Sequence, residues 1–459
     1  MNRVNFFDII SKFILLVIFF MFLSSCGSGS SASSSTSTEY GCTFSGSSQR
    51  NGESVLAWMK QFGESGVVNA KGVNVDQNGN VYIVGKTNVG LFGESQFGAN
   101  DYFIVKYDKS GDFQWVRQLG GIKNTGSAGN SAGEGIRVDN FGNLYIVGYT
   151  DVSLFGQLQN GLTDYFIAKY NENGDLLWGK QVGSPGGDTK GSAIDIDKSC
   201  NIYITGNTNR GISGESRQGD IDYFVAKYNG AGNLKWTREV GASNGDAEGK
   251  GISVDQYGAS YIVGFTNVGI SGESKHGEYD YFVAKYDEAG NLKWTKEVGG
   301  EGSDVALGYG ISIDKNNGKI YIVGQTDFGM SGESQIGFHS YFISRHNESG
   351  NLQWTRIVGA PFGRTVGYGV SAIDDNNIYI TGQTDVGISG ESQVGETDYF
   401  VAKYDQLGAI KWSYQYGIAG EYLNGNAISA DNNGNSYVVG DVDLVGNGVQ
   451  VGYFISKYH

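Results

Sequence analysis

The chain has 459 residues, of which 74 are glycine and two are proline, and its formal net charge at pH 7 is −15. An acidic surface repels phosphate backbones, so this balance argues against nucleic acid as a partner and favours cations or basic partners.

Residues 1–25 predict a lipoprotein signal peptide. A basic N-terminus precedes an apolar run over residues 13–23, which is too short for the roughly 20 residues of a membrane span. The run ends in LSSC at Cys26. This motif resembles a lipobox, which implies that Cys26 becomes the lipid-modified first residue of the mature protein and anchors it to a membrane. An ordinary cleaved signal with an incidental cysteine is the alternative.

Residues 26–53 predict the lipidated cysteine followed by a flexible tether. Positions 27–38 are almost entirely serine, glycine and threonine, which cannot bury enough apolar surface to fold. Gly27 follows the cysteine where an aspartate would suggest retention in the inner membrane. We therefore expect an exported protein at the outer membrane, on its periplasmic side or at the cell surface.

Residues 54–459 contain seven sequence repeats. The tryptophans stand at Trp58, Trp115, Trp178, Trp236, Trp294, Trp354 and Trp412. A tyrosine that opens a Tyr-x-x-Gly segment recurs at Tyr82, Tyr145, Tyr203, Tyr261, Tyr321, Tyr379 and Tyr437. A Tyr-Phe pair recurs at Tyr102, Tyr165, Tyr223, Tyr281, Tyr341, Tyr399 and Tyr453. Because these three markers recur together seven times, the chain contains seven structural units.

Each unit reads as four short strands. Segments such as GISVDQYGASYIVGFT, DYFVAKYDEAGNLKW and TKEVGG alternate β-branched or aromatic residues with glycine-containing turns. Four antiparallel strands repeated seven times predict an all-β fold, a single seven-bladed β-propeller.

The repeated text also resembles a known family. The patterns VD..GN.YI.G.T and D.FVAKY...G...W are similar to the bacterial β-propeller repeat called SBBP over residues 54–459, which implies the architecture and says almost nothing about biochemistry. Three kinds of departure occur. Ser340 and Gly452 replace the aspartate before Tyr-Phe, Cys200 replaces a turn glycine, and Asp374 is shifted by one place.

Similarity to NHL propeller repeats implies that the VD strand is innermost and the tryptophan strand outermost. The last unit then has only three strands before the chain stops at His459. We expect the N-terminal strand around Trp58, residues 55–62, to complete the last blade and close the ring, which leaves no open sheet edge.

Two repeated sets are interpreted as structural. A basic residue inside the third strand recurs at Lys106, Lys169, Lys227, Lys285, Arg345, Lys403 and Lys457. This set could form an anion-binding ring, but its apolar flanks favour stems that lie between blades and heads that pair with repeated aspartates. The tryptophans could stack on carbohydrate, but a residue present in every outer strand favours packing between blades.

The loops between second and third strands are the candidate binding surface. Six of them have equal length, and several share the text GISGES, which indicates a defined conformation. Their glutamates are Glu94, Glu215, Glu273, Glu333 and Glu391, with Gln157 in the second unit. We expect these loops to share a face with the blade-to-blade connections, which carry Glu134, Asp188, Asp246, Glu248, Asp304 and Glu421. The glutamates could instead cap their own loops or, with carbonyl help, hold calcium.

The sequence predicts no catalytic residue, no metal site and no cofactor. Its four histidines, His276, His339, His346 and His459, lack metal-ligand spacing and a recurring serine or cysteine partner. We therefore expect a non-catalytic scaffold that binds protein or glycan through the long-loop face. The alternatives are a purely structural envelope lipoprotein and a propeller enzyme, such as a quinone-dependent dehydrogenase or a polysaccharide-active protein.

A disulfide between Cys42 and Cys200 is the last expectation. These are the two cysteines left if Cys26 carries lipid, and export allows them to oxidise. Such a bridge would place the segment from Cys42 to Ser54 across one mouth of the channel. Two unpaired thiols are the alternative.

Overall fold

The computed structural model describes residues 49–459, apart from 51–52, 55, 64–65, 124 and 445–449. The predicted signal peptide, Cys26 and Cys42 lie outside the described residues. In the part of the chain that the structure describes, no helix has the length and apolar character needed to cross a membrane.

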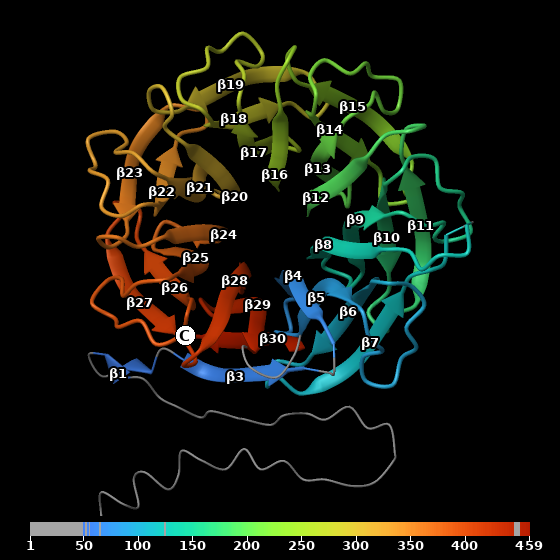
Figure 1. Ribbon diagram of the computed structural model, residues 1–459, viewed down its shortest axis with the longest axis horizontal. Coiled ribbons are helices and arrows are strands. Elements are labelled where there is room, and N and C mark those ends of the chain that lie inside the picture. The colour runs from blue at the N-terminus through green and yellow to red at the C-terminus, as the bar shows by residue number, and fades with distance from the viewer. Residues whose placement is uncertain (1–48, 51–52, 55, 64–65, 124, 445–449) are drawn as a thin grey trace, which may run out of the picture. The chain divides into compact units, whose positions relative to one another are not determined.

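Seven four-stranded antiparallel sheets form a ring of blades, as the repeats predicted (Figure 1). Blades one and two contain β4 (Val68–Val75), β5 (Val81–Thr87), β6 (Asp101–Tyr107), β7 (Phe113–Leu119), β8 (Ser131–Val138), β9 (Leu144–Thr150), β10 (Asp164–Tyr170) and β11 (Leu176–Val182). Blades three and four contain β12 (Thr189–Ile196), β13 (Ile202–Thr208), β14 (Asp222–Tyr228), β15 (Leu234–Val240), β16 (Ala247–Val254), β17 (Ser260–Thr266), β18 (Asp280–Tyr286) and β19 (Leu292–Val298). Blades five and six contain β20 (Ala306–Asp314), β21 (Lys319–Thr326), β22 (Ser340–His346), β23 (Leu352–Val358), β24 (Thr365–Asp374), β25 (Asn377–Thr384), β26 (Asp398–Tyr404) and β27 (Ile410–Tyr416).

The last blade joins the two ends of the ring. It contains β28 (Glu421–Ala430), β29 (Ser436–Leu444), β30 (Gln450–Tyr458) and β3 (Leu56–Phe62). Strand β3 pairs antiparallel with β30, in the order β28-β29-β30-β3. The predicted closure is therefore confirmed, and in every blade the tryptophan strand is outermost (Figure 1). A small separate sheet pairs β1 (Gln49–Arg50) with β2 (Glu53–Ser54).

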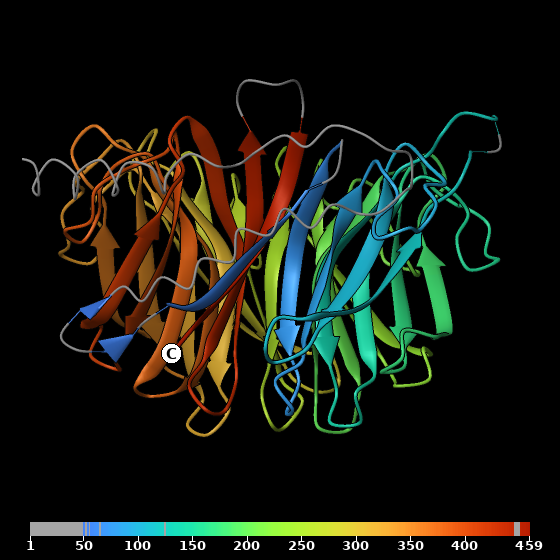
Figure 2. The same ribbon diagram turned by 90° about the horizontal axis from the view of Figure 1, so that it is seen from below.

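The two faces of the ring differ (Figure 2). Short turns between first and second and between third and fourth strands lie at one face, called here the turn face. The loops between second and third strands lie at the other, the long-loop face, and pair there with the blade-to-blade connections through bridges such as Asn100 to Asn130 and Thr163 to Asp188. The expectation that these segments share a face is confirmed.

The repeated aspartate of the VD segment organises the first turn. Asp76 accepts backbone N–H groups of Asn78 and Asn80 through Oδ1, and its Oδ2 accepts the Asn80 amide and the Tyr82 hydroxyl. Gly79 has a φ of 83° in this turn. Cys200 occupies the matching place in blade three with a φ of 58°, so it replaces a turn glycine as the sequence indicated.

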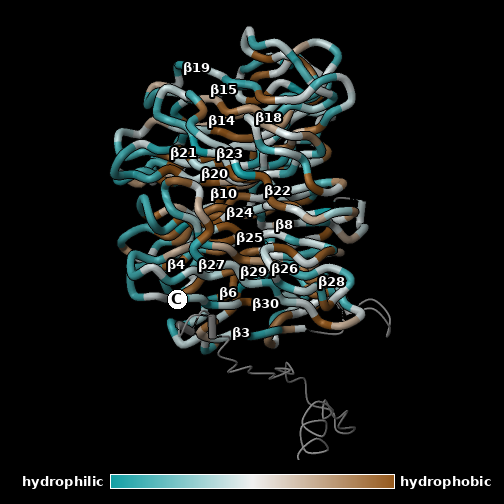
Figure 3. Tube along the Cα trace, turned by 90° about the vertical axis from the view of Figure 1, so that its left-hand side faces the viewer, coloured by the Kyte–Doolittle hydropathy of each residue, from teal (hydrophilic) through white to brown (hydrophobic). Residues whose placement is uncertain are grey.

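The core lies between the blades, where apolar strand residues gather (Figure 3). The tyrosine of each Tyr-Phe pair makes a buried hydroxyl contact with the tyrosine that ends the third strand of the next blade. These pairs are Tyr102–Tyr170, Tyr165–Tyr228, Tyr223–Tyr286, Tyr341–Tyr404, Tyr399–Tyr458 and Tyr453–Tyr107. Blade five has His346 at this place, and the Tyr281 hydroxyl lies 3.4 Å from its Nε2.

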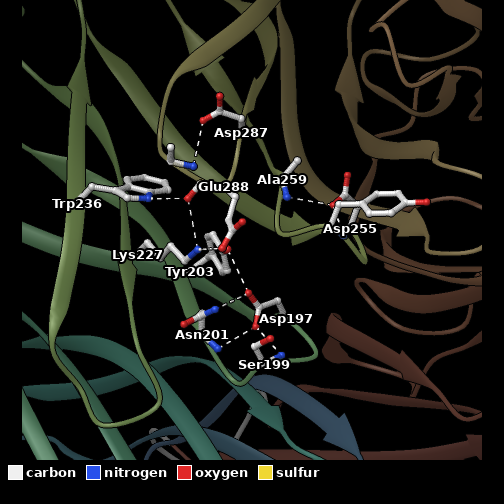
Figure 4. Close-up of polar contacts among 12 residues, drawn as sticks. Asp197, Ser199, Asn201, Tyr203, Lys227, Trp236, Asp255, Ala259, Asp287 and Glu288 are labelled. Carbon is white, nitrogen blue, oxygen red and sulfur yellow. Dashed lines mark hydrogen bonds and ion pairs between the residues drawn. The ribbon is translucent and has the colours of Figure 1, made fainter.

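The junction of blades three and four shows how the basic and tryptophan sets act (Figure 4). Trp236 Nε1 donates to the Glu288 carbonyl of the next blade at 3.0 Å, and its ring packs against the turn at Gly290. Lys227 lies over the Tyr203 ring, 5.0 Å from its centroid, and its Nζ is 3.2 Å from the Glu288 carboxylate.

Packing of the tryptophans between blades is thus confirmed, as is the position of the lysine stems. The predicted aspartate partners are wrong at two junctions, because Lys227 and Lys285 pair with Glu288 and Glu348. The repeated aspartates instead accept hydrogen bonds within their own turns.

Candidate binding site at the axial mouth

The long loops are rigidly held. In blade three the loop forms a turn in which Ser213 and Gly214 both have positive φ, with the Glu215 N–H donating to the Ile212 carbonyl, as in a type I′ turn. The Ile212 side chain is buried. Asp222, fully buried, accepts two further loop N–H groups. The matching residues repeat this arrangement in blades one, two, four and six.

The predicted loop glutamates are directed to the outer edge of the ring. Glu215, Glu273 and Glu333 each form an ion pair with a basic residue two places after the tryptophan of the outermost strand in the same blade. The basic partners are Arg238, Lys296 and Arg356, at 3.7, 3.2 and 3.3 Å. Glu94 and Glu391 occupy the same loop position in blades one and six. The three ion pairs join the long loops of blades three, four and five to the outermost strands of the same blades.

Cys200 lies on the turn face, where its thiol is 3.8 Å from the Asp139 carboxylate. Burial raises the pKa of this thiol, and the Asp139 charge raises it further. Its predicted partner Cys42 is outside the described residues, so the disulfide stays a prediction.

A different set of residues converges on the axis. Every innermost strand contains a β-bulge near its start, where one residue has no partner in the neighbouring strand. The bulged residues are Lys71, Glu134, Ser192, Lys250, Tyr309, Tyr368 and Asn426. All seven are partly exposed and line one axial cavity of about 170 Å³. Bulges redirect side chains and often lie beside functional sites.

One side of this mouth is charged. Lys71 pairs with Asp441 at 3.4 Å, and Lys250 pairs with Glu248 at 2.7 Å. Glu134 stands between the lysines of four strands. Burial raises the pKa of its carboxyl group, although the positive charges of Lys71, Lys86, Lys250 and Lys190 act in the opposite direction.

The other side is aromatic. The rings of Tyr309 and Tyr368 lie 5.4 Å apart, and Phe265 meets Tyr309 edge-on at 6.4 Å. Burial raises the pKa of both tyrosines, so their hydroxyls are neutral hydrogen-bonding groups at pH 7. Lys250 joins the two sides, with its Nζ 5.1 Å from the Phe265 ring centroid.

The charged side continues into a pocket between blades one, two and three. This pocket has a volume of about 270 Å³, and Lys86, Asn100, Asn130, Tyr149 and Lys190 are among its lining residues. Lys190 Nζ lies over the Tyr149 ring, 5.3 Å from the centroid. The axial cavity and this pocket together offer ammonium groups, amides, hydroxyls and ring faces on the long-loop side of the ring.

The opposite mouth has a structural role. Its side chains link each blade to the next around the axis, beginning with the Val138 N–H, which donates to Asn74 Oδ1 at 2.9 Å, and Arg137, which donates to Asp195 at 3.0 Å. The remaining links are Val254 to Asp195, Ile313 to Ser253, Ala372 to Ser312, Ala430 to Ser371 and Asn74 to Ser429. Seven links complete a circle, so these polar groups serve ring closure.

Reasoning from the repeats pointed to the long-loop face, and most residues of its axial mouth were not among the predicted ones. Three acids predicted to lie in connections belong instead to innermost strands: Glu134 to β8, Glu248 to β16 and Glu421 to the start of β28. Lys71, Lys190 and Tyr309 carry no repeated signal. An alignment of the seven units would have marked Lys71 and Tyr309, because the bulge position varies between two repeated neighbours, whereas Lys190 lies outside the bulge.

Comparison with known proteins agrees with the fold. The SBBP model, described as a beta-propeller repeat, matches residues 57–93, 114–156, 177–212, 235–270 and 411–441. An uncharacterized WD repeat-containing protein of Acanthamoeba polyphaga mimivirus is 26% identical over 348 residues, or 59% of this chain and 25% of that protein. Regulatory protein FlaEY of Caulobacter vibrioides is 24% identical over 246 residues, or 47% of this chain and 25% of that protein.

The chain thus spans about a quarter of the length of these two relatives. Among solved structures, a polysaccharide lyase of family PL25, an ulvan lyase, is 12% identical with a TM-score of 0.50, over 85% of this chain and 95% of that one. At this identity the likeness concerns the fold alone. The five matched segments each join an outermost strand to the two innermost strands of the next blade, and these five segments are similar to the SBBP beta-propeller repeat.

Proposed function

We propose that this protein is a non-catalytic glycan-binding module whose ligand enters the axial mouth of the long-loop face. One observation carries the proposal. The seven units repeat their turns, cores and junctions, but the bulged position at the mouth carries lysine, glutamate, serine, tyrosine and asparagine in different units. Variation at the one position that each unit presents to this cavity suits a recognition surface built on a repeated scaffold.

The chemistry of the mouth favours a glycan over a protein. The aromatic side offers ring faces and hydroxyls from Tyr309 and Tyr368, which can pack on sugar rings and bond to their hydroxyl groups. The mouth is concave and small, whereas a stable protein partner would bury about 800 Å² on each side. A chain of sugar rings fits such a surface better.

The glycan proposal is tested with purified protein and a panel of oligosaccharides in isothermal titration calorimetry. We expect the double variant Tyr309→Ala, Tyr368→Ala to lose binding at least tenfold while its melting temperature stays within a few degrees of the parent. Tyr257→Ala is the matched control, because Tyr257 is 76% exposed on the turn face. Equal losses in both variants, or no binding of any oligosaccharide, would refute the proposal.

A propeller enzyme is the competing function. After incubation with a polysaccharide that binds, we expect its chain length in size-exclusion chromatography to be unchanged. A shortened polysaccharide would replace the binding proposal with a catalytic one, such as the polysaccharide-active enzyme considered from the sequence.

We also propose that the protein is exported and held at the outer membrane by lipid on Cys26, which would place the mouth in the envelope where glycans occur. Metabolic labelling with a palmitate analogue tests this. Label should appear in the parent and be absent from Cys26→Ser, and protease treatment of intact cells should then show whether the propeller faces outward. Label retained in Cys26→Ser would contradict the lipid anchor.

A further inference from the structure

The four lysines on the charged side of the mouth differ in their partners. Lys71 and Lys250 have ion-pair partners. Within the described residues, Lys86 and Lys190 have none, and the carboxyl group on which both act is Glu134. Burial raises the pKa of Glu134, while the charges of both lysines act in the opposite direction.

These two lysines line the same pocket from different blades. Lys86 belongs to β5 of blade one and Lys190 to β12 of blade three, and the Tyr149 ring of blade two lies in the pocket wall with them. The neighbouring acid in the pocket wall, Asp151, already has hydrogen-bond and ion-pair partners. It accepts hydrogen bonds from Asn130 and pairs with Lys123 at 2.7 Å, and these contacts hold the pKa of its carboxyl below the ordinary value despite burial.

Two amides and one hydroxyl lie beside the lysines in this pocket. The Asn100 amide donates to Asn130 at 2.7 Å, which fixes both side chains at the pocket edge. Within the described part of the chain, the Tyr149 hydroxyl has no hydrogen-bond partner, and burial raises its pKa, so it stays a neutral donor.

We propose that this pocket binds the acidic group of the glycan, either a uronate carboxylate or a sulfate ester, between Lys86 and Lys190. The inference rests on the proposed glycan function and names its ligand class. The ammonium groups supply the charge, and the Tyr149 ring supplies an apolar surface for the sugar once Lys190 turns toward the anion.

The test uses the full-length propeller and three oligosaccharide probes of equal length: one of glucuronic acid, the same oligosaccharide after reduction of its carboxyl groups, and a sulfated galactan fragment. We expect at least one acidic probe to bind the parent, at least tenfold more tightly than the carboxyl-reduced probe, with affinity that falls as salt rises. Lys86→Gln and Lys190→Gln should each lower that affinity about tenfold and leave the carboxyl-reduced probe unaffected. Lys198→Gln, the same change on the turn face of blade three, should have no effect.

The outcomes separate this inference from the proposed function. Preference for the first or the third probe identifies the anion as carboxylate or sulfate. If the tyrosine variants abolish binding but the lysine variants do not, or if the carboxyl-reduced probe binds as tightly as the acidic ones, the acidic subsite is wrong while the glycan function stands. If no probe and no neutral oligosaccharide binds, the glycan function itself fails.

Discussion

Asp222 and Asp280 each face a glutamate, whereas the matching aspartates of blades one, two and six face a glutamine. In blades one, two and six the glutamine amide donates to the buried aspartate at 2.8 to 2.9 Å, and its carbonyl oxygen accepts a loop N–H. Glu239 and Glu297 keep the loop contact but present a second buried oxygen with no partner among the described residues.

Burial raises the pKa of Glu239 to about 8, and the nearby carboxylates of Asp222 and Glu215 raise it too. Burial likewise raises the pKa of Glu297 to about 7, with Asp280 and Glu273 contributing. The folded protein therefore holds protons that the unfolded chain releases above its ordinary glutamate pKa of 4.5. Stability from these groups is present at low pH and is lost as the pH rises from about 4.5 through 7 and 8.

The first prediction is that Glu239→Gln and Glu297→Gln raise stability at pH 8.5 by about 1 kcal/mol each and change it little near pH 4.5. Each variant restores an amide donor to the buried aspartate. Calorimetric melting across this pH range measures the effect, and Gln118→Glu should produce the opposite change in blade one. Loss of stability at pH 8.5 in the two glutamine variants would contradict this account.

The second prediction concerns the loop glutamates. Glu215, Glu273 and Glu333 are about one-third exposed in their ion pairs, so replacing all three with glutamine should cost less than about 1 kcal/mol per pair in urea denaturation. The pairs should also weaken as salt rises. A much larger loss would show that the loops depend on these contacts for folding.

At the scale of elements, β22 interrupts the series of buried tyrosine pairs. His346 Nδ1 lies 3.1 Å from the Gly350 carbonyl and therefore donates to it, so Nε2 is the acceptor, with the Ser344 hydroxyl at 3.2 Å and the Tyr281 hydroxyl at 3.4 Å. Burial lowers the pKa of this imidazole below 6.5. Because the unfolded chain binds the proton more readily, stability is full above about 6.5 and is lost as the pH falls.

The third prediction is that His346→Tyr stabilises the propeller by about 1 kcal/mol at neutral pH and by more at pH 5, since it restores the tyrosine pair of the other junctions and removes the titrating group. Thermal melts at the two pH values measure this. His346→Phe is the control that removes the proton site without supplying a hydroxyl, so it should remove the acid sensitivity and add no hydrogen bond. Equal acid sensitivity in parent and His346→Tyr would contradict the assignment.

The fourth prediction concerns β3, the strand that completes blade seven. Deleting residues 54–62 should unfold the whole ring in one cooperative transition at lower temperature, because β30 loses its partner and the ring gains an open edge. A truncated protein that kept the melting temperature of the parent would overturn the importance of the closure. Circular dichroism at two wavelengths tests whether the transition is single.

At the scale of the molecule, the fold was predictable and most of the site was not, for one reason. Trp58, Trp115 and their counterparts occupy the same place in seven successive repeats. Blade number, strand order and closure therefore follow from the repeats. Lys86 and Lys190 are more than 100 residues apart and have no counterparts in the other units. The ring places both lysines in one pocket. No single repeat contains both of them, so their proximity could not be predicted from any one repeat.

The offset between sequence repeat and blade has a consequence for how such chains change in evolution. Each matched SBBP segment crosses a blade boundary, and the closing strand stands at the far end of the chain from its partners. Duplication or loss of one whole repeat therefore changes the circumference by one blade and leaves β3 and β30 free to pair. The architecture can gain or lose units without exposing an edge, and each new unit brings one more variable position to the axis.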